Sequence, residues 1–302
     1  MINSKDFDVI IVGGSYAGLS AGMALGRSLR RVLIIDSGKP CNRSTPHSHN
    51  FITHDGEKPA VIAEKAKAQV LNYPTVQFHE GLAVSGEPTG EGFTITTQGG
   101  EEFTAKKLIF VSGVKDILPD IRGFEECWGV SVIHCPYCHG YEVKNARTGI
   151  LANGNFAAHY AQLVRNLTRD LTVFTNGTAE FTSEQADKLK RHGIAVIEKE
   201  IAYFDQENGR IRQVVFSDSS AFSLEALYAR PALEQHCKIP EMLGCELTET
   251  GLIKTDMFQK TSVTHVFACG DSASPMRSVA YAIAGGNITG AMVNSVMTDK
   301  EF

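Results

Sequence analysis

Two cysteines three positions apart, Cys135 and Cys138, are the residues whose spacing most clearly suggests chemistry. A C-x-x-C pair can close a short disulfide, and it can stabilise one of its sulfurs as a thiolate. His139 follows at once, and an imidazole that titrates near neutral pH can carry the proton that thiol–disulfide exchange requires. These three residues predict a redox-active site. For His139, a loop position facing solvent is the alternative.

Zinc binding is the other chemistry open to this pair. A structural zinc site needs four ligands, and the sequence has no second C-x-x-C, although Cys127 and His134 stand nearby. We therefore expect no metal. The remaining cysteines have no such context and are expected to be small buried residues: Cys41, Cys127, Cys237, Cys245 and Cys269.

A glycine-rich turn near the start of the chain is typical of a dinucleotide site. Gly13, Ser15 and Gly18 stand where the pattern G-x-G-x-x-G has its glycines. The first glycine allows a tight turn, the last allows helix and strand to approach closely, and the helix N-terminus offers N–H groups to a pyrophosphate. Asp36, at the end of the next strand, is placed to bind ribose hydroxyls. The pattern predicts a bound dinucleotide; tight packing without a ligand is the alternative.

A second glycine turn is degraded. Ala152 stands where the first glycine would be, Gly154 holds the middle position, and Ala157 holds the third, which the pattern tolerates. The next strand ends in Phe-Thr-Asn-Gly at 174–177, with neither an acid for a ribose nor an arginine for a 2′-phosphate. A nicotinamide site in this half, and NADPH as a cofactor, are therefore left open.

Apolar and turn patterns place these residues in two β–α–β units. The first turn lies between predicted strands and a predicted helix at 7–12, 32–35 and 19–29. Gly18, Gly22 and Gly26 fall on one face of that helix, so it can lie close to its sheet. The pattern restarts with a strand, a helix and a strand at 148–152, 156–167 and 171–175. Further helices are expected at 60–71, 183–192 and 280–296, and further strands at 93–97, 103–105, 107–112, 193–198, 211–216, 222–228 and 266–268.

Length and composition limit the class of protein. The chain has 302 residues, a net charge of −5, 43% hydrophobic and 21% charged residues, which is typical of a globular protein with two domains. The mild acidity and the lack of a basic run argue against a nucleic-acid partner. The polar start of the sequence is unlike a signal peptide, and the one uncharged apolar run, 9–26, contains glycines and has no second span beside it. We predict a cytoplasmic protein without membrane contact, whose thiols are mostly free.

The order of these features resembles the low-molecular-weight thioredoxin reductase family of FAD-dependent disulfide oxidoreductases. A dinucleotide turn comes first, then a second β–α–β domain with C-x-x-C just before its first strand, then Cys-Gly-Asp at 269–271. The resemblance covers nearly the whole chain and implies FAD as cofactor and a homodimer. It implies that Cys138 faces the flavin, that Cys135 attacks the substrate disulfide, and that His139 stands where typical members have an acidic proton donor. The cofactor-binding residues that it implies are Gly13, Gly14, Ser15, Gly18, Asp36, Ser37, Asn50, Gly113, Asp271, Arg277 and Ser278.

The resemblance gives these cofactor residues different roles. The glycine turn and the acid after it would hold the ADP half of FAD, and Asn50 resembles the family's flavin-side asparagine. Gly113 would close the first arm of the domain. Asp271 would bond the ribityl or phosphate part, and Arg277 and Ser278 would line the flavin ring.

Two loops depart from the typical pattern. Thr-Pro-His-Ser-His-Asn-Phe at 45–51 and Cys-Pro-Tyr-Cys-His-Gly at 135–140 look more like the branch that includes the dithiol oxidases of gliotoxin and holomycin biosynthesis. Those enzymes pass electrons from a small dithiol through FAD to oxygen. His47 and His49 would then act as bases near the flavin; loop solvation or a metal pair are the alternatives. The degraded second turn fits such an oxidase, and fits equally a reductase fed by another donor such as a ferredoxin.

The sequence thus predicts an α/β protein with two Rossmann-like (FAD/NAD(P)-binding) domains, the second inserted into the first. The FAD-binding domain would comprise 1–114 and 241–302, and 115–240 would form an inserted NAD(P)-binding-like domain that carries the C-x-x-C pair. We predict an FAD-dependent thiol–disulfide oxidoreductase that moves electrons between FAD, the Cys135/Cys138 pair and an external partner. That partner would be a thioredoxin-like protein or a small-molecule dithiol or disulfide. An oxygen-dependent dithiol oxidase, a reductase with a non-nicotinamide donor and a non-catalytic flavin redox sensor are the alternatives.

Overall fold

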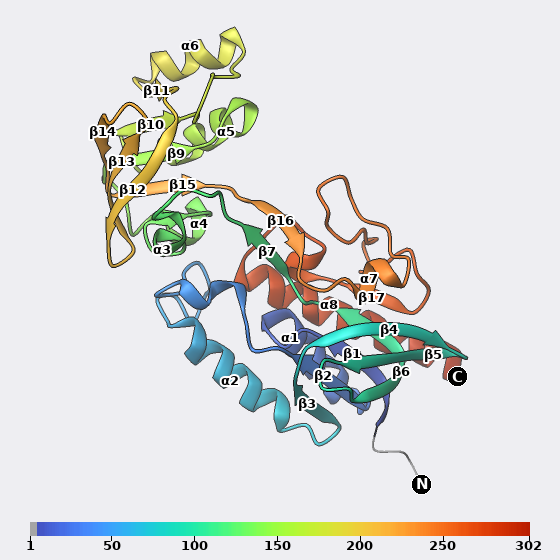
Figure 1. The fold of residues 1–302 in the computed structure, drawn as a ribbon. Coiled ribbons are helices and arrows are strands. Elements are labelled where there is room, and N and C mark those ends of the chain that lie inside the picture. Colours follow the sequence, from blue (N-terminus) through green and yellow to red (C-terminus); the bar gives the residue numbers. More distant parts are fainter. Residues whose placement is uncertain (1–4) are drawn as a thin grey trace. The chain divides into compact units, whose positions relative to one another are not determined.

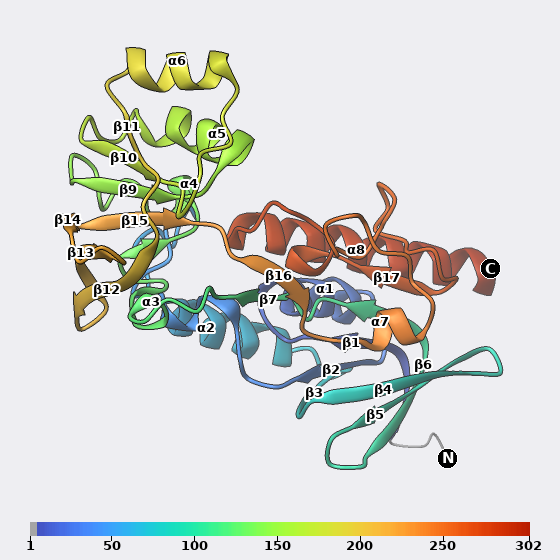
Figure 2. The same ribbon diagram turned by 45° about the horizontal axis from the view of Figure 1, so that its top comes forward.

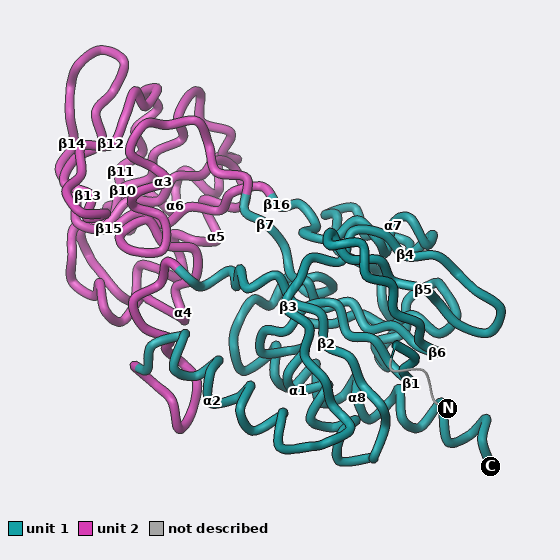
Figure 3. The backbone as a smooth tube through the Cα atoms, turned by 60° about the horizontal axis from the view of Figure 1, so that its bottom comes forward, with its two compact units in different colours: residues 1–43, 57–116, 233–302 teal, residues 44–56, 117–232 magenta. Residues whose placement is uncertain are grey.

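The computed structural model describes residues 5–302, and these fall into two compact units (Figure 3). Unit 1 comprises the chain up to residue 43 together with 57–116 and 233–302, and unit 2 comprises 44–56 and 117–232. The domain boundaries predicted from the sequence, after residue 114 and before residue 241, stay predictions. The loop 44–56, which carries two histidines, belongs to unit 2.

A seven-stranded sheet forms the centre of unit 1 (Figures 1 and 2). Its strands lie in the order β3–β2–β1–β6–β5–β4, and β17 pairs with the second half of β6. Strands β3, β2, β1, β6 and β17 run parallel, whereas β4 and β5 form an antiparallel edge. The bounds are β1 Asp6–Val12, β2 Val32–Asp36, β3 Val76–Glu80, β4 Ala83–Thr89, β5 Gly92–Thr97, β6 Glu102–Phe110 and β17 Val266–Ala268.

The helices of unit 1 pack tightly because small residues line their contacts. A Cβ on Gly22 of α1 would come 2.7 Å from a side-chain carbon of Ile34 in the sheet. A Cβ on Gly286 of α8 would come 2.1 Å from the carbonyl oxygen of Ala17 in α1. The glycine face predicted for the first helix therefore does allow a close approach to the sheet. The helices and 3-10 turns are α1 Tyr16–Arg27, η1 Cys41–Ser44, α2 Pro59–Leu71, α7 Ile239–Met242, η2 Gly270–Ser272 and α8 Val279–Glu301.

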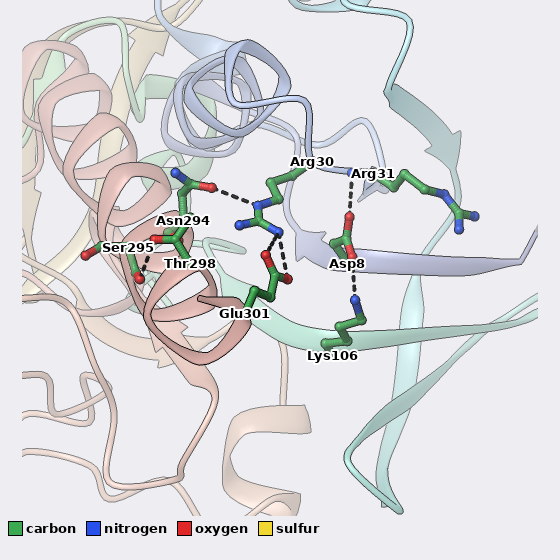
Figure 4. Close-up of polar contacts among 8 residues, drawn as sticks. All are labelled: Asp8, Arg30, Arg31, Lys106, Asn294, Ser295, Thr298 and Glu301. Carbon is green, nitrogen blue, oxygen red and sulfur yellow. Dashed lines mark hydrogen bonds and ion pairs between the residues drawn. The ribbon is translucent and has the colours of Figure 1, made fainter.

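Polar contacts fix the end of α8 to the first β–α–β unit (Figure 4). The Arg30 guanidinium, between α1 and β2, donates to Asn294 Oδ1 and to the Glu301 carboxylate, each at 2.8 Å. Beside it, Asp8 of β1 accepts from the Lys106 ammonium of β6 at 2.9 Å. The last helix of the chain thus returns to the first residues of the fold.

Unit 2 has a parallel sheet and a small antiparallel sheet. The parallel sheet has the order β11–β10–β9–β15–β8, and the antiparallel sheet has the order β12–β13–β14. The strands are β8 Val132–Ile133, β9 Thr148–Leu151, β10 Leu171–Phe174, β11 Ala195–Ile197, β12 Ile201–Glu207, β13 Arg210–Phe216, β14 Ala221–Ser223 and β15 Ala226–Ala229. The helices are α3 Phe124–Cys127, α4 Pro136–His139, α5 Gly154–Val164 and α6 Ser183–Arg191.

Two short strands stand where the chain passes between the units. β7 (Val114–Ile117) and β16 (Ala232–Gln235) pair with each other in a two-stranded sheet. The sequence also predicts crossings between the two domains at 113–119 and 232–240, with a hinge there, and both strands lie inside these segments. A hinge at these crossings stays a prediction.

Several predicted strand limits are wrong. The two strands expected at 103–105 and 107–112 are one continuous strand, β6, which pairs with β5 along its first half and with β17 along its second. The strand expected at 222–228 is two strands, β14 and β15, in different sheets. Here sheet partners decide the strand limits, and local hydrophobicity does not show them. Across residues 5–302, none of the helices has the length and apolar character needed to cross a bilayer.

Candidate functional site

The turn between β1 and α1 is shaped for close backbone approach. Gly13 has a φ of +113°, and a Cβ there would come 2.4 Å from the carbonyl oxygen of Val111. A Cβ on Gly18 would come 1.9 Å from the carbonyl oxygen of Gly13. Within the described chain, the Ser15 side chain makes no capping hydrogen bond to α1, and the first turn has no acidic residue. Neither the N-cap side chain nor an acid of the first turn therefore occupies the N–H groups at this helix start, which suits a pyrophosphate.

Asp36 connects the end of β2 to this turn. Its carboxylate accepts from the backbone N–H of Gly14 at 2.6 Å and from that of Gly38 at 2.7 Å. A Cβ on Gly14 would lie 2.7 Å from the Asp36 Cβ, so only glycine brings the turn this close. The remaining lone pairs of the carboxylate can accept from ribose hydroxyls. Ser37, the next residue, is exposed beside the carboxylate.

The carboxyl edge of β6 and β17 gathers further polar groups. The N–H of Gly113, whose φ is +72°, donates to Ser272 Oγ at 2.7 Å. The Gln235 amide nitrogen donates to the Ser272 carbonyl oxygen at 2.9 Å. Among residues 5–302, two buried side-chain oxygens of this edge find no partner, Ser112 Oγ and Gln235 Oε1. A buried polar atom without a partner is costly, so these atoms suit a polar ligand at the edge.

Arg277 sits in a half-buried ionic network of unit 1. Its guanidinium forms a bidentate pair with Asp116, at 2.7 and 3.2 Å, and its Nε lies 3.3 Å from Asp271. Burial raises the pKa of Asp271 above its ordinary value, although Arg277 opposes this shift. Ser278 caps α8 by accepting from the backbone N–H of Tyr281. The roles predicted for Asp271 toward the ribityl or phosphate part, and for Arg277 and Ser278 toward the flavin ring, stay predictions; what the structure shows is ion pairing and helix capping.

The corresponding turn in unit 2 is closed by its own side chains. Asn153 Oδ1 accepts from the N–H of Gly154 and from that of Glu180, both at 2.9 Å, and so caps α5. A Cβ on Gly154 would lie 3.9 Å from Glu180 Oε2, so a carboxylate stands near this helix start. After β10, the turn is built by Asn176, with a φ of +51°, and by Thr175. The capped and acidic helix start is unfavourable for a pyrophosphate.

The cysteine pair lies on a short helix in unit 2. Cys135 is the N-cap residue of α4, and Cys138 Sγ donates to Cys135 Sγ across 2.7 Å. Both cysteines are partly exposed, and the Tyr137 ring between them is 69% exposed. The sulfurs are therefore close enough to exchange dithiol for disulfide, and a partner molecule can reach the loop that carries them.

His139 ends α4 and is flanked by the 44–56 loop. The His139 and His49 rings meet edge to face, with centroids 6.3 Å apart. Burial, and then the neighbouring His49, lower the pKa of His139, whereas Glu142 raises it. His49 lies 3.5 Å from a Glu142 carboxylate oxygen and 3.6 Å from one of Asp55. A histidine held neutral beside a thiol pair can accept the thiol proton.

The other two predicted residues of this loop lie in unit 2 as well. His47 packs beside His49, with ring centroids 6.4 Å apart. Asn50 has a φ of +56°, and its backbone N–H donates to Asp55 at 2.7 Å. The structure groups Asn50 with the histidines, and a flavin-side role for it stays a prediction. The described residues contain no group of three or more His, Cys, Asp or Glu side chains placed to hold a metal ion.

Comparison with known proteins agrees with this arrangement. Residues 7–286 match the family model described as pyridine nucleotide-disulphide oxidoreductase. The protein named thioredoxin reductase sirT from Leptosphaeria maculans is 31% identical, over 95% of this chain and 93% of its own. The crystal structure of an oxidoreductase from Agrobacterium tumefaciens is 38% identical, with a TM-score of 0.91 over 97% of this chain and 99% of its own. The crystal structure of HlmI is 31% identical, with a TM-score of 0.93 over 100% of this chain and 95% of its own.

Two Rossmann-like folds and a C-x-x-C pair in the second of them define the class of FAD-dependent disulfide oxidoreductases. The chain belongs to the pyridine nucleotide-disulphide oxidoreductase family, and within it is thioredoxin reductase-like. Its cofactor is FAD. The uncapped start of α1, the Asp36 carboxylate and the unpaired oxygens at the β6 edge all fit that cofactor.

Some residues of these sites escape sequence reasoning. Asp116 stands 161 positions from Arg277, and Glu142 is 93 positions from the histidine that it approaches, so no local spacing signals either contact. Gln235 lies in a short strand with no turn or glycine pattern around it. Of these residues, only Asn153 has a sequence signal that could have revealed its role, because asparagine directly before a helix is a common N-cap residue.

Proposed function

We propose that this protein transfers electrons between FAD, the Cys135/Cys138 pair and an external thiol or disulfide. The observation that carries the proposal is the pair of sulfurs 2.7 Å apart on α4, with a neutral histidine directly after them. In the oxidising direction, an external dithiol attacks the Cys135–Cys138 disulfide, leaves as its own disulfide, and the pair takes up two electrons and two protons. FAD, when bound, supplies the two-electron redox centre for the pair.

The residues of the chain hold the reactants and move protons in this proposal. The turn residues Gly13, Gly14, Ser15 and Gly18 and the acid Asp36 would bind the ADP half of FAD, with Ser37, Asn50, Gly113, Asp271, Arg277 and Ser278 as the further cofactor residues. His139 would accept the proton of the attacking thiol and return it to the departing one. The partner would be a thioredoxin-like protein or a small-molecule dithiol or disulfide.

The source of electrons is the finer part of the proposal. In unit 2, Asn153 fills the helix start that would bind an NADPH pyrophosphate, and Glu180 adds a negative charge beside it. This supports a protein that is not fed by NADPH. The second candidate function is therefore an oxygen-dependent oxidase of a small dithiol; a non-nicotinamide donor such as a ferredoxin would fit the same observation.

Anaerobic titration of the flavin's visible absorbance separates these functions. We expect no bleaching when NADPH is added and bleaching when a dithiol follows; in air, the dithiol alone should then drive oxygen uptake. Bleaching by micromolar NADPH would overturn the degraded-site proposal. Absence of turnover with every thiol and disulfide would leave only the redox sensor.

A matched pair of cysteine variants tests the role of α4. Cys138→Ser should keep its yellow colour and lose all dithiol turnover. Cys245→Ser is the control, because Cys245 donates to Thr261 Oγ1 in unit 1 and serine can keep that hydrogen bond. Equal loss in both variants would contradict the assignment. We also propose a cytoplasmic homodimer on the strength of the family resemblance; light scattering on the purified protein tests the dimer.

A further inference from the structure

Two tyrosines lie beneath the helix that carries the cysteine pair. Tyr160 comes from α5 and Tyr228 from β15, where Tyr228 stands in register with Ile133 at the end of β8. Their rings meet edge to face with centroids 6.3 Å apart, inside the same buried cluster of unit 2. Both tyrosines therefore pack next to the connection between β8 and α4.

The two hydroxyls differ in what they bind. Tyr160 donates to the carbonyl oxygen of His134, at 2.7 Å, and so holds the residue before Cys135. Tyr228 is 0% exposed, and its hydroxyl has no hydrogen-bond partner among residues 5–302. A buried hydroxyl without a partner is costly, and native structures keep one for a reason.

The position of the Tyr228 hydroxyl points to the cysteine pair. A Cβ on Gly140, directly after α4, would come 2.9 Å from this oxygen and 2.3 Å from the carbonyl oxygen of Pro136. The hydroxyl therefore lies against the underside of the C-x-x-C helix, and Gly140 makes that approach possible. Burial raises the pKa of Tyr228 well above its ordinary value, and among its charged neighbours Cys135 has the largest effect, ahead of Tyr160 and Glu142. The group thus remains a proton donor at any working pH.

We propose that the Tyr228 hydroxyl donates a hydrogen bond to the Cys135 thiolate when the cysteine pair is reduced. Reduction of the Cys135–Cys138 disulfide by two electrons and two protons gives two thiols. Of these, the Cys135 sulfur is the hydrogen-bond acceptor, because Cys138 Sγ donates to it. Tyr228 adds a second donor to the same sulfur. In the structure the two cysteines are not joined by a disulfide, Cys138 Sγ donates to Cys135 Sγ, and the Tyr228 hydroxyl has no partner among residues 5–302. A Cys135 sulfur that has lost its proton would give the hydroxyl an acceptor that neither the disulfide nor the neutral dithiol offers, so the hydroxyl favours the thiolate form of the reduced pair over the disulfide. This inference rests on the redox role proposed for the pair.

Alkylation of the reduced, FAD-loaded protein tests this donor. The rate at which iodoacetamide modifies Cys135, followed by mass spectrometry against pH, gives the pKa of that thiol. A hydrogen bond to a charged group shifts a pKa by about one to two units. Tyr228→Phe should therefore raise the pKa of Cys135 by at least about one unit, which lowers the thiolate fraction about tenfold at any pH below that pKa. Tyr160→Phe removes a hydroxyl from the same cluster and should leave this pKa unchanged. His139 directly follows Cys138 in the chain, and it is unchanged in both variants.

A redox equilibrium provides the second measurement. In glutathione buffers, Tyr228→Phe should shift the dithiol–disulfide equilibrium of the pair about tenfold toward the disulfide, or about 30 mV for two electrons. An unchanged pKa and an unchanged equilibrium in Tyr228→Phe, or equal changes in Tyr160→Phe, would overturn the proposal. A pair that forms no disulfide in any of the proteins would instead refute the proposed redox function, since the thiol pKa is measured without turnover.

Discussion

Replacing His49 by glutamine should move the pH dependence of thiol oxidation, because His49 acts on the proton acceptor of the site. Burial and then His49 lower the pKa of His139, so His139 is neutral and able to accept a proton below the ordinary histidine range. The rate of reaction with a dithiol should rise with pH through this lowered pKa. Removing His49 takes away both its electrostatic effect and a ring packed against His139, and both changes raise the pKa of His139.

The distance between the two rings sets the size of the effect. At 6.3 Å between centroids, a unit charge costs ~0.7 kcal/mol in the dielectric of water and ~2.6 kcal/mol at an effective dielectric of about 20. These energies correspond to about 0.5 to 2 pKa units. In His49→Gln, the acidic limb of the rate should therefore move to higher pH by an amount in that range, with the plateau at high pH retained.

The assay is the rate of pair reduction by a dithiol, measured from pH 5 to 8 as the ratio of variant to wild type. The ratio cancels the ionisation of the dithiol itself, which is common to both proteins. His47→Gln is the matched control, because the His47 ring packs beside His49 with centroids 6.4 Å apart, whereas the pKa of His139 is shifted by burial, His49 and Glu142. A limb that moves to lower pH in His49→Gln, or that moves equally in His47→Gln, would refute the reasoning.

Three further substitutions, one of them with a matched control, test the packing and the cofactor site. Gly286→Ala should destabilise the protein by about 1–3 kcal/mol, since its Cβ would come 2.1 Å from a backbone oxygen of α1; Gly285→Ala, whose Cβ finds 3.5 Å of room, should not, as thermal unfolding will show. Asp116→Ala should cost about 3–5 kcal/mol in denaturant unfolding, because it leaves the half-buried Arg277 without its bidentate partner. Asp36→Ala should weaken FAD binding at least tenfold in flavin-release titrations, since two charge-assisted backbone hydrogen bonds disappear; unchanged retention would contradict its role.

The sequence predicted the elements that carry strong local signals. The first strand, turn and helix are visible because a β-branched run precedes glycines at helical spacing, and the structure has them at β1 and α1. The sequence prediction missed strands β3, β4, β7, β8, β12 and β16, because they are short or half exposed and their pairing depends on partners elsewhere in the chain. Helix α4 was missed for another reason: a four-residue helix begins with proline after a cysteine, and no amphipathic period can develop in so short a segment.

For the sites, the residue types were visible and the neighbours were not. The sequence places Cys135, Cys138 and His139 together without help from the fold. It does not reveal that His49 reaches His139, because 90 positions separate them. It also leaves the second glycine turn ambiguous. Only the structure supplies the hydrogen bonds by which Asn153 closes that turn.

The two turns show how one fold element comes to serve two purposes. Each joins a buried parallel strand to a helix whose positive end faces the carboxyl edge of its sheet. At α1, among residues 5–302, the N-cap side chain makes no capping bond and the first turn has no acid, while the Asp36 carboxylate of the adjacent strand binds the turn at Gly14 and leaves the helix N–H groups open, so a dinucleotide can complete the site. At α5 an asparagine caps the helix within its own turn and Glu180 stands beside it, so the same electrostatic demand is met internally. A helix start that is already satisfied gains little from a phosphate, and this is the physical basis of our proposal that the second unit carries the cysteine pair without binding a second nucleotide.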